Sequence, residues 1–245
     1  MTRCWVLAAL ALAAYEAEGA DPTVATYTAS YRVDYKGKEA GTAEFSVRYL
    51  ADGDLYEFTS SVVAKGLLKL ARPKPAVERS QFRVDASGIH PLEFWYEDGT
   101  RSGEDNLHVV FDWDRRVATV NSAAARRELP LPEGALDRGS LQVALMRDLA
   151  TAGAVRKYTL ADEDSVAEYE YKENGTATMP TGTGQVATRI LTQQRAGSSR
   201  ATWLWVAPEL RFLPVRIEQR RDGEVQTAFT LVSVDGLAAG VAAAR

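Results

Sequence analysis

Cysteine and histidine are nearly absent from this sequence, and each shortage removes a class of chemistry. The single cysteine is Cys4, inside an N-terminal segment that we expect to be cleaved. The mature chain then has no disulfide, no thiolate nucleophile and no thiolate metal site. Histidine is the usual general base near neutral pH, and His90 and His108 are the two in the sequence.

A basic surface and the common catalytic motifs are missing as well. The formal net charge is −4, without the basic stripe that nucleic-acid binding needs. No Gly-x-Ser-x-Gly nucleophile elbow accompanies the histidines. The acidic runs at 112–114 and 162–164 lack the glycine and terminal glutamate of a calcium loop. We therefore predict no nucleic-acid partner, no cofactor, no metal site and no identifiable catalytic residue.

The N-terminus has the order of a secretory signal peptide. Arg3 supplies a positive charge, Cys4 to Ala14 is an unbroken apolar run, and residues 15–20 turn small and polar. A membrane-spanning helix needs about 20 apolar residues, so we do not expect a spanning segment. Because Cys4 begins the apolar run and does not follow it, it cannot become the lipid-modified first residue of a mature chain.

These features predict three parts and one compartment. We expect a cleaved signal peptide at 1–19, a single β-rich domain at 20–236 and a flexible Ala/Gly-rich tail at 237–245. An earlier cleavage point, after residue 13, fits the small-x-small pattern too. The mature protein is expected to be soluble and periplasmic.

Alternating hydrophobic residues predict a mainly β domain. Residues 27–35, 43–49 and 56–64 alternate apolar with polar side chains between short turns, which is typical of an antiparallel meander. Similar segments continue to residue 234, giving about a dozen strands. One helix is expected from an N-cap at Asp137 to a stop at Gly153. Because so large a sheet curls or closes, we predict one large curved antiparallel sheet or partly open barrel, with one principal helix on its concave side.

The candidate binding site consists of aromatic residues of the first three strands and leucines that follow them. The aromatic residues share one face of the sheet and form either an ordinary core or the lining of a cavity for an apolar ligand. Leu67, Leu68 and Leu70 form either a flap at the cavity mouth or a small helix at the sheet edge. The ligand-binding residues that we predict are Tyr31, Tyr35, Phe45, Tyr49, Phe58, Leu67 and Leu68.

Several motifs, taken in order, resemble a known family. They include Tyr31–Gly41 (YRVDYKGKEAG), Glu78–Phe82 (ERSQF), Leu136–Gln142 (LDRGSLQ), and Trp203–Pro208 leading into Leu213–Ile217 (LPVRI). Together they resemble the exported bacterial family called domain of unknown function 3108, over about residues 27–231. The resemblance implies a curved-sheet protein of the lipoprotein-carrier type and supplies no catalytic residue.

Three functions are compatible with this architecture. We favour a non-enzymatic periplasmic protein that binds an apolar ligand, such as a lipid or acyl chain, or a cell-envelope protein. A cell-envelope hydrolase could instead act on glycan through paired carboxylates, with Trp95, Trp113, Trp203 and Trp205 stacking on sugars. A third alternative is a scaffold whose sheet edge or exposed face binds another protein.

Overall fold

The computed structural model describes residues 24–50, 54–154, 157–195 and 197–237. The predicted signal peptide at 1–19 lies outside these residues, as does all of the predicted tail at 237–245 except Leu237. Within the described ranges, no helix is long and apolar enough to cross a membrane.

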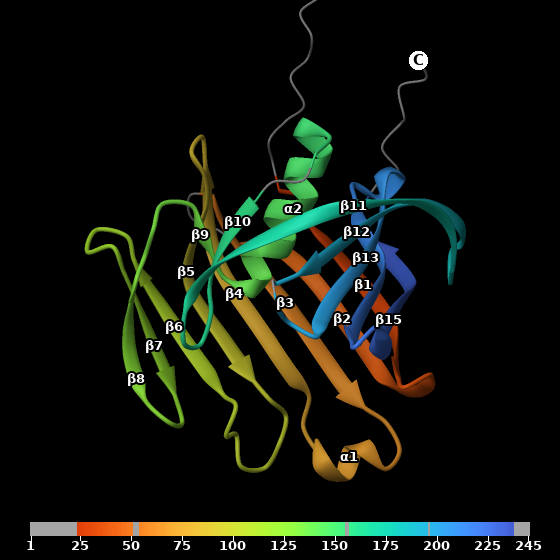
Figure 1. Cartoon of the computed structure of the whole chain (residues 1–245), viewed down its shortest axis with the longest axis horizontal. Coiled ribbons are helices and arrows are strands. Elements are labelled where there is room, and N and C mark those ends of the chain that lie inside the picture. The colour runs from red at the N-terminus through yellow and green to blue at the C-terminus, as the bar shows by residue number, and fades with distance from the viewer. Residues whose placement is uncertain (1–23, 51–53, 155–156, 196, 238–245) are drawn as a thin grey trace, which may run out of the picture.

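In the residues that the structure describes, a single sheet of 15 strands forms most of the fold (Figure 1). Its order is β8 to β1 and then β15 to β9, so consecutive strands are neighbours and β1 pairs with β15. Neighbouring strands are antiparallel except for β9 and β10, which are parallel. The strands are β1 (Tyr27–Tyr35), β2 (Lys38–Leu50), β3 (Leu55–Ala64), β4 (Ala76–Asp85), β5 (Gly88–Glu97), β6 (Leu107–Asp112), β7 (Val117–Ser122), β8 (Arg126–Pro130), β9 (Ala135–Leu136), β10 (Lys157–Ala161), β11 (Val166–Thr181), β12 (Gly184–Gln194), β13 (Arg200–Ala207), β14 (Leu213–Arg221) and β15 (Glu224–Asp235).

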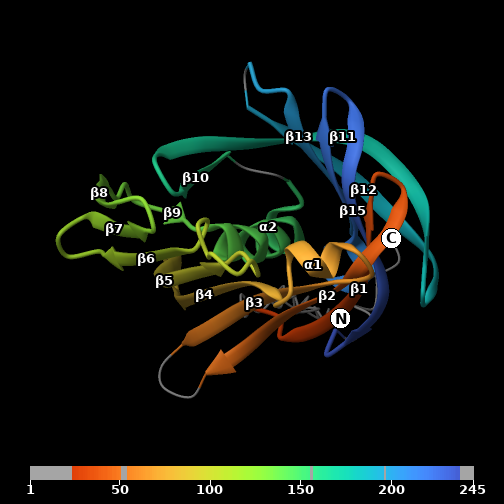
Figure 2. The ribbon, with the colours of Figure 1, turned by 90° about the horizontal axis from the view of Figure 1, so that it is seen from below.

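The sheet curves around a helix. Figure 2 shows β3 to β7 on one side of α2 (Arg138–Ala152) and β10, β11 and β13 on the other. Register shifts in β1, β4, β11, β13 and β14 mark bulges, which bend strands and increase their twist. The last strand of the order, β9, packs against β5, so the curved sheet approaches closure. Two short helical turns, α1 (Leu68–Ala71) and η1 (Pro208–Leu210), lie between strands.

Strand alternation supplies the core. In β1, Tyr27, Ala29, Tyr31 and Val33 are buried, whereas Thr28 and Arg32 are exposed, because successive side chains point to opposite faces. The buried residues of most strands and of α2 form one hydrophobic cluster. A second cluster, which includes Phe94, Val109 and Leu131, fills the space between β5–β7 and β9.

Local signals determine where α2 begins and ends. Asp137 caps its N-terminus by accepting hydrogen bonds from the backbone N–H groups of Gly139 and Ser140, and Ser140 Oγ accepts from Asp137 N–H at 2.9 Å. Gly153 ends the helix at φ 68°, a left-handed conformation that glycine adopts without steric cost. The predicted fold, a mainly β curved antiparallel sheet with one principal helix, is confirmed.

Candidate functional site

A cavity of about 700 Å³ lies between the concave face of the sheet and α2. Its exposed lining residues Tyr35, Leu68 and Arg72 lie at the α1 end of the strands, so the cavity opens there. Apolar side chains from α2 and from both halves of the sheet supply most of the wall. They include Val33, Phe45, Val62, Leu141, Leu145, Leu204, Ile217 and Phe229.

The predicted ligand-binding residues fall into three groups. Tyr35, Phe45 and Leu68 line the cavity. Tyr31 and Phe58 are buried beside Phe45, with ring centroids 4.8 and 6.2 Å from its own. The remaining two, Tyr49 and Leu67, are outside the lining and are 53% and 86% exposed.

The position of each residue along its strand explains these differences. Tyr31 lies mid-strand, and its hydroxyl donates to the carbonyl oxygen of Pro214 at 2.9 Å, which ties β1 to β14. Tyr49 has the inward parity of Phe45 but lies at the end of β2, where its ring packs edge-on against Tyr56. Parity therefore identifies a face of the sheet, whereas burial also depends on the distance from the strand end.

One charged pair interrupts the apolar wall. Arg138, the first residue of α2, places Nη1 3.5 Å from Oε1 of Glu78 on β4. Its guanidinium lies over the rings of Phe94 and Tyr96, at 5.1 and 4.9 Å from their centroids. Among the described residues, the buried Nε of Arg138 has no hydrogen-bond partner. Burial raises the pKa of the Glu78 carboxyl, and the charge of Arg138 opposes that rise.

The start of α2 holds this pair in place. Asp137 is buried, and its Oδ2 accepts a hydrogen bond from Ser80 Oγ on β4. Burial raises the pKa of the Asp137 carboxyl to about 6, against the hydrogen bonds from Ser140, Ser80 and Gly139. Ser80 lies two residues after Glu78, so the bond that anchors the helix also sets Arg138 opposite Glu78.

Three more contacts fix α2 over the cavity. A Cβ on Gly139 would lie 2.7 Å from both Phe58 Cδ1 and Ser80 Cβ, so the helix approaches the sheet where it has no side chain. Gln142 Nε2 donates to Tyr27 Oη on β1 at 3.3 Å. Tyr158 Oη on β10 donates to Asp148 Oδ2 at 3.1 Å. The helix is thereby attached to both halves of the sheet.

Neither histidine lies in the cavity. The Nε2 atom of His90 is 2.8 Å from Ser87 Oγ and 3.2 Å from Asp85 Oδ1 in an exposed turn. A Ser-His-Asp triad needs its serine and its carboxylate on different ring nitrogens, so this cluster is not one. His108 stacks on Trp95 at 5.3 Å on the outer face. Among the described cavity-lining residues, Glu78 is the only carboxylic acid.

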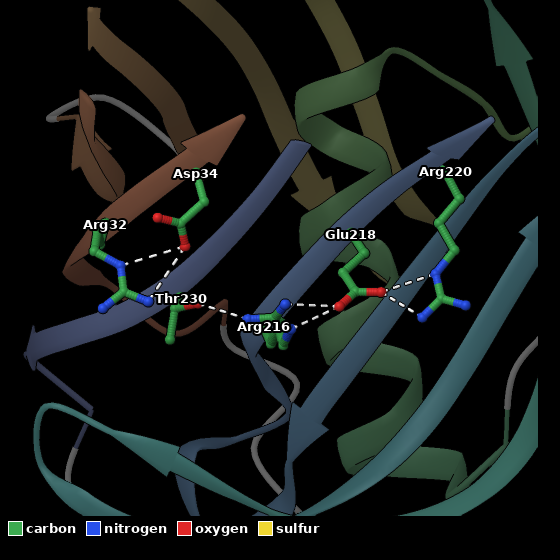
Figure 3. Close-up of polar contacts among 6 residues, drawn as sticks. All are labelled: Arg32, Asp34, Arg216, Glu218, Arg220 and Thr230. Atoms are coloured by element: carbon green, nitrogen blue, oxygen red, sulfur yellow. Dashed lines mark hydrogen bonds and ion pairs between the residues drawn. The ribbon is translucent and has the colours of Figure 1, made fainter. Parts of the chain in front are cut away.

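The outer face carries a separate polar network (Figure 3). Glu218 on β14 is buried, and its two oxygens accept hydrogen bonds from Nε of Arg216 and Nε of Arg220, both at 2.8 Å. Arg216 Nη1 also donates to Thr230 Oγ1 on β15 at 2.9 Å. The two guanidiniums lie over Trp205 and Trp203, at 5.9 and 4.2 Å from the ring centroids. These tryptophan faces and this carboxylate are thus occupied by the chain itself.

Metal ligands do not converge in the part of the chain that the structure describes. Within those ranges, no group of three or more histidine, cysteine, aspartate or glutamate side chains could hold a metal ion.

Two of the motifs that carry the family resemblance lie together in the structure. Glu78–Phe82 supplies Glu78 and Ser80, and Leu136–Gln142 supplies the cap, Arg138, Gly139 and Gln142. A family model matches residues 30–230. The chain belongs to the protein family of unknown function DUF3108. In this DUF3108 protein, two of the family-like motifs meet at one wall of the cavity. A search of curated proteins gave no match.

Solved structures with a related chain path are distant in sequence. A β-barrel-like protein of domain of unknown function DUF1849 from Brucella abortus has a TM-score of 0.48 and 11% identity, covering 86% of this chain and 98% of its own. A candidate lipoprotein from Parabacteroides distasonis has a TM-score of 0.33 and 9% identity, with coverage of 86% and 95%. A candidate exported protein with a YmcC-like fold from Bacteroides fragilis has a TM-score of 0.35 and 12% identity, with coverage of 85% and 95%.

Arg138, Glu78 and Gln142 are not among the site residues predicted from the sequence. The sequence does contain a pointer to these residues, because all three lie inside the motifs that carry the family resemblance. Only the fold brings β4 and the start of α2 together.

Proposed function

We propose that this is an exported, non-enzymatic protein of the cell envelope that holds a lipid or another acyl-chain ligand in the cavity beneath α2. The observation that carries the proposal is the cavity itself, whose volume of about 700 Å³ lies within the range of about 300–1,000 Å³ usual for small-molecule sites. Its wall is mainly apolar, and each buried methylene of a ligand contributes about 0.8 kcal/mol.

The charged pair of Arg138 and Glu78 makes one part of the cavity wall polar. An acyl chain would lie against residues such as Leu141, Leu145 and Leu204. Its polar end would face the guanidinium of Arg138, which lines the cavity and whose side chain is 35% exposed. A carboxylate or phosphate oxygen is the acceptor that a guanidinium binds best. The preferred ligand is therefore an amphiphile with an acidic end.

One feature supports ligand binding over hydrolysis, and another supports an exported location. The described cavity wall has one carboxyl group and no histidine, which is too few groups for a paired-carboxylate hydrolase. The N-terminal sequence has the order of a secretory signal peptide. Export is tested by cell fractionation with N-terminal sequencing of the recovered protein, and recovery from the cytoplasm with Met1 retained would contradict it.

Ligand binding is tested by native mass spectrometry of the protein purified from a periplasm, followed by organic extraction of any bound molecules. We expect a reproducible added mass that extraction identifies as a lipid or fatty acid. Ser60 lines the cavity and Ser61 follows it on the other face of β3. Ser60→Phe should reduce the bound fraction, and Ser61→Phe should leave it unchanged. A clean protein mass, unaltered by incubation with fatty acids and phospholipids, would refute the proposal.

A further inference from the structure

The segment between β3 and β4 exposes apolar side chains at the cavity mouth. Leu67 and Leu70 are 86% and 72% exposed, and α1 has no buried residue. Leu68 is also exposed, and it lines the cavity together with Ala71 and Arg72. Figure 1 shows α1 beyond the end of β3, away from the body of α2.

Exposed apolar side chains are concentrated in this place. Seven large hydrophobic residues are exposed in the described part of the chain, and four of them lie between residues 63 and 70. A fifth, Tyr35, lines the same cavity and ends β1 at this end of the sheet. Single exposed apolar residues are ordinary, but a cluster of them marks a surface that contacts something apolar.

The same segment is basic, although the whole chain has a formal net charge of −4. Residues 65–74 contain Lys65, Lys69, Arg72 and Lys74 and no acidic residue. Among the described residues, Lys65 forms an ion pair with Glu39 at 2.6 Å, and no ion pair involves Lys69 or Lys74.

Asp98, the acidic residue that Arg72 contacts, uses its carboxylate within its own loop. Arg72 donates to the backbone oxygen of Asp98 at 2.6 Å, not to its carboxylate. The Asp98 carboxylate is buried and accepts hydrogen bonds from Thr100 and from the backbone N–H of Asp105 in its own loop. The exposed side of residues 65–74 therefore combines leucines with basic side chains.

We propose that residues 65–74 dock the protein on an anionic lipid bilayer, with the cavity mouth facing the membrane. Exposed leucines enter the boundary between headgroups and acyl chains, and lysines remain at the level of the anionic headgroups. The charge of the segment complements a bilayer surface that carries phosphatidylglycerol. Docking goes beyond ligand binding in the cavity and does not require it, although it would place the mouth where an acyl chain can pass without crossing water.

Co-sedimentation of the mature protein with lipid vesicles tests the docking surface. We expect binding to vesicles of phosphatidylcholine mixed with phosphatidylglycerol, weaker binding to phosphatidylcholine alone, and a decrease with added salt. Leu67→Asp and the double variant Lys69→Glu/Lys74→Glu should each weaken binding by about tenfold or more.

Matched controls lie at the opposite end of the strands. Tyr49→Asp replaces another exposed apolar side chain with one negative charge, and Arg83→Glu/Arg211→Glu reverses two exposed basic charges. Both should bind as the wild type does. Ser60→Phe should keep vesicle binding even where it loses bound lipid, which separates docking from occupancy of the cavity.

Three results would overturn docking. The wild type could fail to sediment with the mixed vesicles, or the control variants could lose as much binding as the α1 variants. Alternatively, Leu67→Asp could leave vesicle binding intact and instead abolish a concentration-dependent dimer seen by analytical ultracentrifugation. That last result would assign the leucines to contact with a second copy of the chain.

Discussion

Ser80 and Asp137 lie 57 residues apart in the chain, and Ser80 Oγ donates a 2.7 Å hydrogen bond to Asp137 Oδ2 in the buried space where α2 meets β4. Both residues are almost fully buried. The bond joins the N-cap of α2 to β4, a strand of the cavity wall. The position of the helix and the formation of the wall therefore depend on each other.

Stability should depend on pH through Asp137. Burial raises the pKa of its carboxyl from 3.8 to about 6, so the folded protein binds this proton more tightly than the unfolded chain does. The contribution is complete below about pH 4 and is lost as pH rises through about 6. Between pH 7 and pH 4, the unfolding free energy of the wild type should gain up to about 3 kcal/mol relative to Asp137→Asn. Urea denaturation between pH 4 and pH 7 measures the unfolding free energy of both proteins. Parallel pH profiles for the wild type and Asp137→Asn would contradict the prediction.

Gly139→Ala should destabilise the protein. In an open helix, replacing glycine with alanine stabilises by about 1 kcal/mol. Here the new methyl group would lie 2.7 Å from Phe58 Cδ1 and Ser80 Cβ. Overpacking of this kind costs about 1–3 kcal/mol, so the sign should reverse. Chemical denaturation measures the unfolding free energy of the variant and the wild type. A more stable variant would mean that α2 does not approach the sheet this closely.

Arg138→Gln should alter which ligands bind. Loss of the guanidinium removes the donor that faces an acidic end group, and we expect fatty-acid affinity to fall about tenfold. The affinity for a fatty alcohol of equal chain length should change little. Arg79→Gln is the control, since Arg79 lies over Trp95 on the outer face. Isothermal titration calorimetry with each ligand provides both affinities. Equal losses for acid and alcohol would argue against Arg138 as the polar contact.

Glu218→Gln should cost stability and leave ligand binding unchanged. The carboxylate is buried between Arg216 and Arg220, and hydrogen bonds to charged groups contribute about 1.5–3 kcal/mol. The network lies on the face of the sheet opposite α2 (Figure 3). Thermal unfolding and native mass spectrometry measure the two effects. A variant of normal stability that has lost its ligand would show that the outer face belongs to the binding site.

Local pattern was sufficient to predict most of the fold. Both β1 and the limits of α2 at Asp137 and Gly153 were predictable, because their signals come from residues that are close together in the chain. Strands β8 and β9 were not predicted. β8 (Arg126–Pro130) is an exposed edge strand without alternation, and β9 has two residues. β8 pairs with the preceding strand β7, but its own residues do not alternate, and β9 pairs with β10, which follows α2 in the chain.

The candidate site was harder to predict than the fold. Phe45 could be found from parity because it lies in the middle of a strand. Arg138 and Glu78 could not, since their pairing requires the curvature that brings α2 over β4. The exposure of Leu67 likewise depends on how α1 projects from the sheet, which composition does not reveal.

The pairing of β1 with β15 has a consequence for how the molecule is made. These strands are the first and last of the sheet in chain order, yet they are hydrogen-bonded neighbours in its middle. The two flanking arrays can form early from hairpins, but they become one sheet only after the chain has been made as far as residue 235. Contacts of such long sequence separation slow folding. A nascent chain must therefore keep two unpaired strand edges soluble until its final strand arrives, which favours assistance by a chaperone during that interval.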